Sequence, residues 1–191
     1  IGVNKRFGIN ALSSAIVDNV FLNTLNYSQY DGSKAIILYN SSPATANTQI
    51  NANAIENYRI GINAININDF TSAPYPSVQN TIKWNILNSN IISNHFGVLL
   101  ENCPNAQLGF TYIEKTTPPP PGTNYVKVQG IKIDNSTSCY VQENKIINAA
   151  SGISIYNNCA STELHCNIMD ACKRGVNLNN ATLPTQGTTA P

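Results

Sequence analysis

Charged residues are scarce in this sequence. Asp, Glu, Lys and Arg make up 11% of the 191 residues, whereas an ordinary soluble domain has about 25%. Eleven basic and ten acidic residues give a net charge of +1, which excludes the clustered basic charge of a nucleic-acid-binding surface. No apolar run approaches the roughly 18 residues of a membrane span. No CxxC pair, P-loop or Rossmann glycine pattern occurs, so we expect neither a metal site nor a cofactor.

Asparagine, by contrast, is abundant. It occupies 30 of the 191 positions, while the apolar share stays at 42%. This apolar share is close to that of a globular domain and well above that of a disordered chain. The length suits one domain better than two. We therefore expect a folded domain that uses asparagine for a structural purpose.

A six-residue repeat recurs along the chain, with the pattern small, apolar, any, apolar, any, Asn. The residue at the first position of each copy, called the small position below, is Gly8, Ala35, Gly61, Gly97, Gly130, Gly152 or Gly175. Successive steps are 27, 26, 36, 33, 22 and 23 residues. The first copy ends in Ser13 instead of Asn. Steps of this length are typical of a solenoid, in which each turn is covered by its neighbours.

Each copy has the period of two that predicts a strand with one buried face. A second strand is predicted before most copies, over 53–57, 90–94, 144–148 and 167–171, where Asn begins the segment. One turn of the solenoid therefore carries two or three short strands. We expect Ile62, Val98, Leu100, Ile131, Ile133, Ile153, Ile155, Val176 and Leu178 to face one continuous core, and Leu99, Lys132, Ser154 and Asn177 to face outward.

The paired patterns Asn-x-Ile-x-Asn and Gly-Ile-x-Ile-x-Asn resemble the coil repeat of right-handed parallel β-helices of the pectate-lyase-like superfamily. The resemblance extends from Gly8 to Asn180. It implies an all-β fold, a right-handed parallel β-helix of about seven coils. It leaves the function open, because such coils serve polysaccharide lyases, glycoside hydrolases, tailspikes, adhesins and surface stalks.

The last position of the repeat predicts an asparagine ladder. Stacked coils would place these side chains about 4.8 Å apart, where each amide can both donate and accept. Asn also tolerates the left-handed conformation that a turn requires. We expect the ladder to be buried in the stack. Its members are Asn40, Asn66, Asn102, Asn135, Asn157 and Asn180.

Three loop insertions are expected in the β-helix domain, which we assign to residues 1–182. They lie near 27–32, 67–79 and 114–125, and the last two contain prolines that must leave the sheet. Residues 183–191 are polar and contain proline, so we interpret them as a linker or tail. Tyrosines on or beside rigid coils are candidates for binding, and we single out Tyr27, Tyr30, Tyr75 and Tyr156.

The sequence offers one candidate pair of catalytic carboxylates, Glu101 and Asp134. Both lie four residues after the small position in successive coils, hence about 5 Å apart in a stack. That separation would suit a retaining glycosidase. The paired Asp, Gly-His-Gly and Arg-Ile-Lys signatures of polygalacturonases are lacking, as is an Asp cluster with a nearby Arg. We therefore favour a solvated column without a catalytic role.

The five cysteines lie in the second half of the chain. Cys103, Cys139 and Cys159 follow the same predicted strand in three successive coils, where both disulfide bonds and buried free thiols are open alternatives. His95 shares its repeat position with Arg59 and Lys173, and we expect a basic line on the surface there.

These features predict a non-catalytic β-solenoid module that acts as a structural spacer or as a component of a filament or bacterial surface. We expect it outside the cell or on the cell surface, with glycan contacts through its loops. The alternative is a fragment of a polysaccharide lyase or glycoside hydrolase. Expected partners are adjacent domains of a longer chain or copies of the chain stacked end to end, with Ile9 and Leu12 of one copy against Val176 and Leu178 of the next. Polysaccharide is a further expected partner, and nucleic acid is not.

Overall fold

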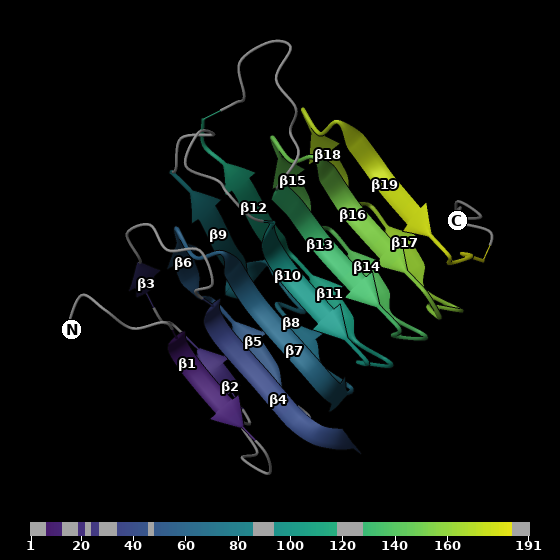
Figure 1. Ribbon diagram of the computed structural model, residues 1–191. Helices are drawn as coiled ribbons and strands as arrows, with labels where there is room; N and C mark the ends of the chain where they lie inside the picture. Colours follow the sequence, from purple (N-terminus) through teal and green to yellow (C-terminus); the bar gives the residue numbers. More distant parts are fainter. Residues whose placement is uncertain are drawn as a thin grey trace.

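The chain folds into a right-handed parallel β-helix of seven coils, and this confirms the fold class expected from the repeat. The computed structural model describes residues 7–12, 19–21, 24–26, 34–45, 48–85, 94–117 and 128–184, with side chains from 34–40 and from 48 onward within these ranges. Three parallel sheets, which we call A, B and C, run the length of the stack, and β1 and β19 lie at its opposite ends (Figure 1).

The chain passes through sheets A, B and C in that order six times, and β19 then adds the seventh strand of sheet A. Sheet A consists of β1 (Phe7–Leu12), β4 (Lys34–Thr45), β7 (Ile60–Asn68), β10 (His95–Glu101), β13 (Val128–Asp134), β16 (Ser151–Tyr156) and β19 (Arg174–Asn179). Sheet B consists of β2 (Asn19–Phe21), β5 (Gln49–Asn51), β8 (Thr71–Ser72), β11 (Gln107–Gly109), β14 (Tyr140–Gln142) and β17 (Glu163–His165). Sheet C consists of β3 (Thr24–Asn26), β6 (Ala54–Glu56), β9 (Asn80–Trp84), β12 (Thr111–Lys115), β15 (Lys145–Ile147) and β18 (Ile168–Asp170).

The six-residue repeat forms the strands of sheet A in the expected register. Val98 pairs with Ile131 and Ile131 with Ile153, and these side chains are 0% exposed. Leu99 belongs to a separate small cluster with Ile60 and Phe96, on the opposite face of the sheet. The predicted alternation of inward and outward positions holds in register, but the outward residues Leu99 and Ser154 are themselves buried, at 7% and 0% exposed.

The core is a single column enclosed by the three sheets. Isoleucine dominates it, together with Leu100, Leu108, Phe70 and Trp84. Val176 and Leu178 occupy core positions by register but are 41% and 47% exposed, because β19 is the edge strand of sheet A among the described residues.

Two of the expected insertions contain more regular structure than a loop. Range 67–79 includes the end of β7, all of β8 and a 3-10 turn, η1 (Pro76–Val78). Range 114–125 begins inside β12, and residues 118–125 lie outside the described part. The prolines at 74 and 76 do leave the sheet, between β8 and β9. The insertion at 27–32 lies outside the described residues.

The second-strand prediction matches sheet C in three coils, where β6, β15 and β18 fall within the predicted segments. In the third coil the strand of sheet C is β9. Most of the segment predicted there, residues 90–93 of 90–94, lies outside the described part of the chain. Among the described residues, no helix has the length and hydropathy needed to cross a membrane.

Candidate functional site

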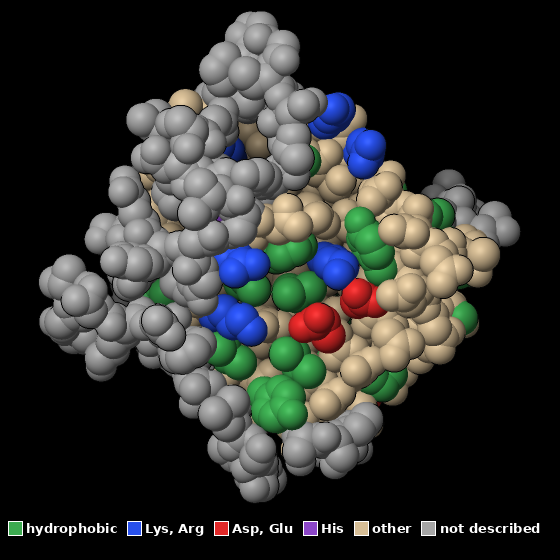
Figure 2. Space-filling view, in the orientation of Figure 1, with side chains coloured by type: hydrophobic (Ala, Val, Ile, Leu, Met, Phe, Trp, Pro, Cys, Tyr) green, Lys and Arg blue, Asp and Glu red, His purple; other side chains and the backbone are tan. Residues whose placement is uncertain are grey.

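The outer face of sheet A collects the candidate functional side chains. Positions two and four after the small position alternate with the core positions and therefore face away from the core. Register places Lys132 beside Leu99 and Ser154, and Asp134 beside Glu101 and Tyr156. Figure 2, which views this face, shows hydrophobic side chains next to a small group of charged ones.

Glu101 and Asp134 are register partners on β10 and β13, so their backbones lie one strand spacing apart, about 4.8 Å. Asp134 is already engaged by the protein on both carboxylate oxygens. Its Oδ2 accepts a hydrogen bond from Lys132 Nζ at 2.9 Å, and its Oδ1 accepts one from Asn157 Nδ2 at 2.6 Å. A nucleophile or general base needs a carboxylate oxygen that can reach the substrate. This arrangement therefore favours a structural ion pair at Asp134.

Lys132 joins this ion pair to an aromatic ring. Its Nζ lies 4.7 Å from the centroid of the Tyr156 ring, which is within the range of a cation–π contact. Asn177 Nδ2 also donates to the Tyr156 hydroxyl at 3.4 Å. Tyr156 is half-buried. Its contacts with Lys132 and Asn177, from the coils on either side, hold the ring in place.

A surface hollow of about 190 Å³ lies beside Tyr156. Its lining includes Gln129, Lys173, Arg174 and Asn177. Within the described residues, Gln129 Oε1 is a buried oxygen without a hydrogen-bond partner. The Tyr156 ring, the Asn177 amide and the cationic side chains of Lys173 and Arg174 can contact the hydroxyl groups of a ligand.

The two candidate tyrosines that the structure describes, Tyr75 and Tyr156, do not share a site. Tyr75 is 67% exposed and lies between β8 and η1, whereas Tyr156 belongs to β16, three coils further along. Tyr27 and Tyr30 lie outside the described residues. Only Tyr156, of the two described, lies next to other candidate residues.

The asparagine ladder runs along the turn that follows each strand of sheet A. Asn66 Nδ2 donates to the Asn40 carbonyl at 2.8 Å, and Asn102 Nδ2 donates to Asn66 Oδ1 at 3.2 Å. The column continues from Asn135 to Asn102 and from Asn180 to Asn157. One contact deviates, because Asn157 donates to Asp134 instead of Asn135.

This ladder does not lie in the packed interior, contrary to expectation. Asn40, Asn66 and Asn102 are half-buried, while Asn135, Asn157 and Asn180 are exposed. The physical reason is backbone geometry: the five members from Asn66 onward have φ between 48° and 58°, and this left-handed conformation ends the strand and turns the chain at the rim of the coil. We call this column the rim ladder.

A second column of asparagines is the buried one. Asn53, Asn80 and Asn144 lie between sheets B and C and are at most 1% exposed. Asn53 Nδ2 donates to Asn80 Oδ1 at 3.1 Å, and Asn144 Nδ2 donates to Asn167 Oδ1 at 2.9 Å. We call this column the buried ladder. The signal was present in the sequence as the Asn that begins three of the four predicted second strands, but its position inside the stack was not predicted.

The buried ladder satisfies backbone groups that no water can reach. Asn144 Oδ1 accepts from the Thr111 N–H at 3.0 Å, and Asn144 Nδ2 donates to the carbonyls of Leu108 and Gln142 at 3.1 and 3.0 Å. Such groups are costly when left unpaired. Both asparagine columns are therefore part of the scaffold that positions the outer face.

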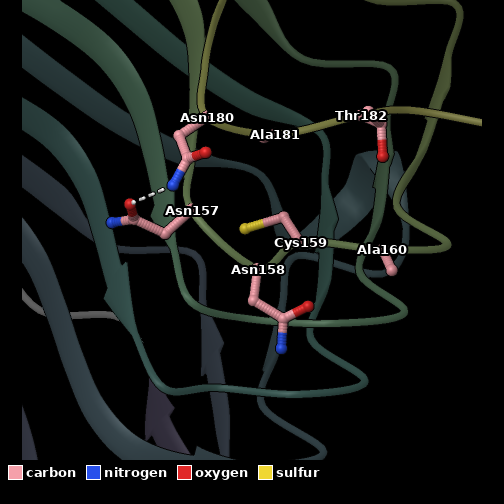
Figure 3. Close-up of a pocket in the computed structure, with 7 residues that line it drawn as sticks. All are labelled: Asn157, Asn158, Cys159, Ala160, Asn180, Ala181 and Thr182. Carbon is pink, nitrogen blue, oxygen red and sulfur yellow. Dashed lines mark hydrogen bonds between the residues drawn. The ribbon is translucent and has the colours of Figure 1, made fainter.

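A hollow of about 380 Å³ lies where the rim ladder reaches Asn157 and Asn180, and Figure 3 shows the residues that line it. Asn157, Asn158, Asn180 and Thr182 contribute polar groups to it, and Cys159 contributes a thiol. The dashed line marks the hydrogen bond from Asn180 to Asn157. No charged side chain lines this hollow, so the polar groups there are amides, a hydroxyl and a thiol.

Cys103, Cys139 and Cys159 are buried free thiols, so of the two alternatives the structure has the free form. Burial raises the pKa of Cys103 from 9.0 to about 11 and that of Cys139 to about 12. Burial also raises the pKa of Cys159. Since the thiolate is the reactive form, these thiols are suited to packing.

Neither histidine has the surroundings of a metal ligand. His95 is 4% exposed and makes an edge contact with Trp84 at 6.2 Å between ring centroids, so the expected basic line does not extend to it. His165 Nε2 lies 3.0 Å from Glu163 Oε2. Across the described ranges, no group of three or more His, Cys, Asp or Glu side chains could hold a metal ion.

Lys115 is a buried cation that the sequence did not indicate, because it was assigned to a loop. It ends β12, is 2% exposed and donates from Nζ to the Thr117 carbonyl. Burial lowers the pKa of this amine, since desolvation disfavours the charged form.

No protein-family model, curated protein or solved structure matches the chain. The functional argument therefore rests on the coil architecture and on the outer face of sheet A.

Proposed function

We propose that the chain is a non-catalytic β-solenoid module of an extracellular or surface protein, in which it acts as a rigid spacer and contacts glycans through the outer face of sheet A. The observation that carries this proposal is the state of Asp134. Both of its carboxylate oxygens are bound by side chains of the protein. One member of the stacked carboxylate pair singled out from the sequence is therefore already bound within the protein.

The two ladders support a spacer role. Hydrogen-bonded asparagines join successive coils along the turn after sheet A and again between sheets B and C. Each coil is thereby tied to its neighbours by polar contacts as well as by core packing. An array of such coils resists bending better than a set of linked small domains, because no flexible linker separates its units.

Membership of the pectate-lyase-like superfamily is part of the proposal. It is supported by the coil repeat and by the parallel three-sheet architecture. The extracellular setting follows from the same resemblance, since coils of this kind serve surface stalks, adhesins and tailspikes. The glycan contact is supported by the hollow beside Tyr156, where a fixed ring lies next to the side chains of Lys173, Arg174 and Asn177.

The test is a depolymerisation assay on acidic and neutral polysaccharides, with detection of new reducing ends and of unsaturated products. We expect no activity from the wild-type chain or from the Glu101→Gln/Asp134→Asn variant. Activity that is present in the wild type and lost in the variant would overturn the non-catalytic assignment.

Glycan contact is tested separately by affinity electrophoresis in gels that contain the same polysaccharides. Tyr156→Ala should lose retardation by at least one polysaccharide, and Tyr75→Ala serves as the control because Tyr75 is exposed but lies outside this face. If no polysaccharide retards the wild-type chain, or if Tyr156→Ala is retarded as strongly as the wild type, the glycan part of the proposal is wrong.

The second candidate function is a fragment of a polysaccharide lyase or glycoside hydrolase. It is favoured by one observation, the register pairing of Glu101 with Asp134, because adjacent carboxylates about 5 Å apart suit a retaining mechanism. In that case Lys132 would have to release Asp134 when the substrate binds. The depolymerisation assay distinguishes the two candidates.

A further inference from the structure

One residue on the outer face of sheet A is buried more deeply than its position in the strand explains. Ser154 lies two residues after the small position, in a row of the sheet that faces away from the core, and its register partners are Lys132 and Asn177. Both partners are partly exposed, whereas Ser154 is 0% exposed. Another side chain must therefore cover Ser154 from the outside.

The ring of Tyr156 provides this cover. Tyr156 is the next outward residue on β16, and its hydroxyl accepts a hydrogen bond from Asn177 Nδ2 at 3.4 Å. On the other side, Lys132 Nζ lies 4.7 Å from the ring centroid. Both contacts come from the row of Ser154. The ring is therefore folded back along β16 and lies above this serine.

The folded-back ring reaches the hollow of about 190 Å³ on this face. Three other residues that line the hollow, Gln129, Ser151 and Arg174, share the row just before the small position. A Tyr156 ring that pointed the other way, towards the rim ladder, would leave the hollow without its aromatic wall. The direction of this one side chain therefore determines the chemistry of the hollow.

The small size of Ser154 permits this direction. Its hydroxyl oxygen is buried and has no hydrogen-bond partner among the described residues, so hydrogen bonding does not explain a serine here. Leu99 occupies the same row two coils earlier, which shows that the row itself accommodates a large side chain. At position 154, a side chain of that size would occupy the space of the Tyr156 ring.

Lys132 keeps the ring in this direction. Its Nζ donates to Asp134 Oδ2 at 2.9 Å, and Asp134 Oδ1 is bound in turn by Asn157. The ammonium group is therefore fixed beside the Tyr156 ring, to which a cation is attracted electrostatically. The carboxylate of Asp134 thus acts on the aromatic ring through the lysine.

We infer that Ser154 and the ion pair between Lys132 and Asp134 position the Tyr156 ring for glycan contact. The inference rests on the proposed glycan contact through the outer face of sheet A, and it names the residues that set the geometry of that contact. These are positioning residues, because they act through Tyr156. Ser154 leaves the space into which the ring folds, and Lys132 holds the ring there.

Nitration of tyrosines by tetranitromethane, mapped by mass spectrometry, tests the direction of the ring without a ligand. We expect Ser154→Leu and Lys132→Met each to raise the nitration rate of Tyr156 several-fold, because each change releases the half-buried ring into solvent. Tyr75 is the internal reference, since it is 67% exposed and should react equally in all variants. An unchanged rate at Tyr156 in both variants overturns the inference.

Affinity electrophoresis connects the ring to binding, with polygalacturonate as the acidic probe and dextran as the neutral probe. Ser154→Leu and Lys132→Met should lose most of the retardation of the wild type, whereas the conservative variants Ser154→Ala and Lys132→Arg should keep it. Lys83→Met is the matched control, because this lysine makes a similar contact, at 5.3 Å, with the Tyr112 ring on sheet C. Urea unfolding should give similar midpoints for all five variants.

The outcomes separate this inference from the proposed function. A wild-type chain that no polysaccharide retards removes the glycan contact and the positioning role together. A wild-type chain that is retarded, with Ser154→Leu and Lys132→Met retarded as strongly, leaves the glycan contact intact and overturns only the inference. Because the two variants change different residues, failure of Ser154→Leu to fold leaves Lys132→Met and its arginine counterpart to decide the outcome.

Discussion

Asparagine serves two different purposes in this molecule. In the rim ladder it is needed for its backbone, because residues such as Asn102 and Asn135 have φ of 54° and 48°, which few other residues adopt at low cost. In the buried ladder it is needed for its side chain, because Asn144 connects three backbone groups of neighbouring turns. The same residue type therefore has a conformational role at the surface and a hydrogen-bonding role inside.

This distinction predicts unequal effects of the same substitution. Asn144→Leu should lower the free energy of unfolding by about 3 kcal/mol, because three buried backbone groups lose their partner. Asn135→Leu should cost about 1 to 2 kcal/mol, from the strained backbone conformation and one lost contact between exposed side chains. Urea unfolding of both variants measures the difference. Equal losses would show that burial of the ladder does not determine its contribution.

At the scale of the element, the glycines of sheet A permit close stacking of coils. A Cβ on Gly130 would lie 2.5 Å from the Gly152 carbonyl oxygen and 2.6 Å from Ile146 Cγ2. No positive φ accounts for these glycines, since that conformation occurs at the asparagines instead. At Gly61, Gly97, Gly130 and Gly152 the next coil and the adjacent side chains leave no room for a Cβ, whereas the second coil accommodates the methyl group of Ala35.

Gly130→Ala should therefore destabilise the chain by about 1 to 3 kcal/mol, the usual range for overpacking of a tight site. Gly175→Ala is the matched control, because its Cβ would meet only Met169 Sδ at 3.7 Å, and it should change stability by no more than about 0.5 kcal/mol in dilute solution. Thermal unfolding followed by circular dichroism provides the comparison. A Gly130→Ala variant as stable as the wild type would mean that the coils can separate at this position without cost.

At the scale of the whole molecule, stability is distributed along the stack. Each strand of a sheet pairs only with its counterparts in the adjacent coils, so an inner coil has two neighbours and an end coil has one. In such a linear array the free energy is approximately a sum of coil and interface terms. The end coils should therefore open more readily than the centre.

Hydrogen exchange followed by mass spectrometry should show this gradient. In dilute solution we expect the amides of β13 to exchange at least tenfold more slowly than those of β19, because β19 has a partner on one side only. Uniform protection along sheet A would indicate that the chain unfolds as one cooperative unit and that the end coil is not weaker.

The sequence by itself determined the coil, its core and the rim ladder. These features depend on residues a few positions apart, the alternation of apolar positions around Ile131 and Ile133 and the Asn that ends each strand, and they repeat at a recognisable period. It also placed Glu101 beside Asp134, because register follows once the small positions are aligned.

Only the tertiary structure decided which groups meet across coils. The steps between copies vary, so the sequence did not show that Asn80 and Asn144 belong to a buried ladder, that 67–79 contains β8, or that His95 is buried. Likewise, Asp134 is bound by Lys132, two residues away on the same strand, and by Asn157, which lies one coil further along. The Asn157 contact arises from packing between segments 23 residues apart, and local patterns carry no record of it.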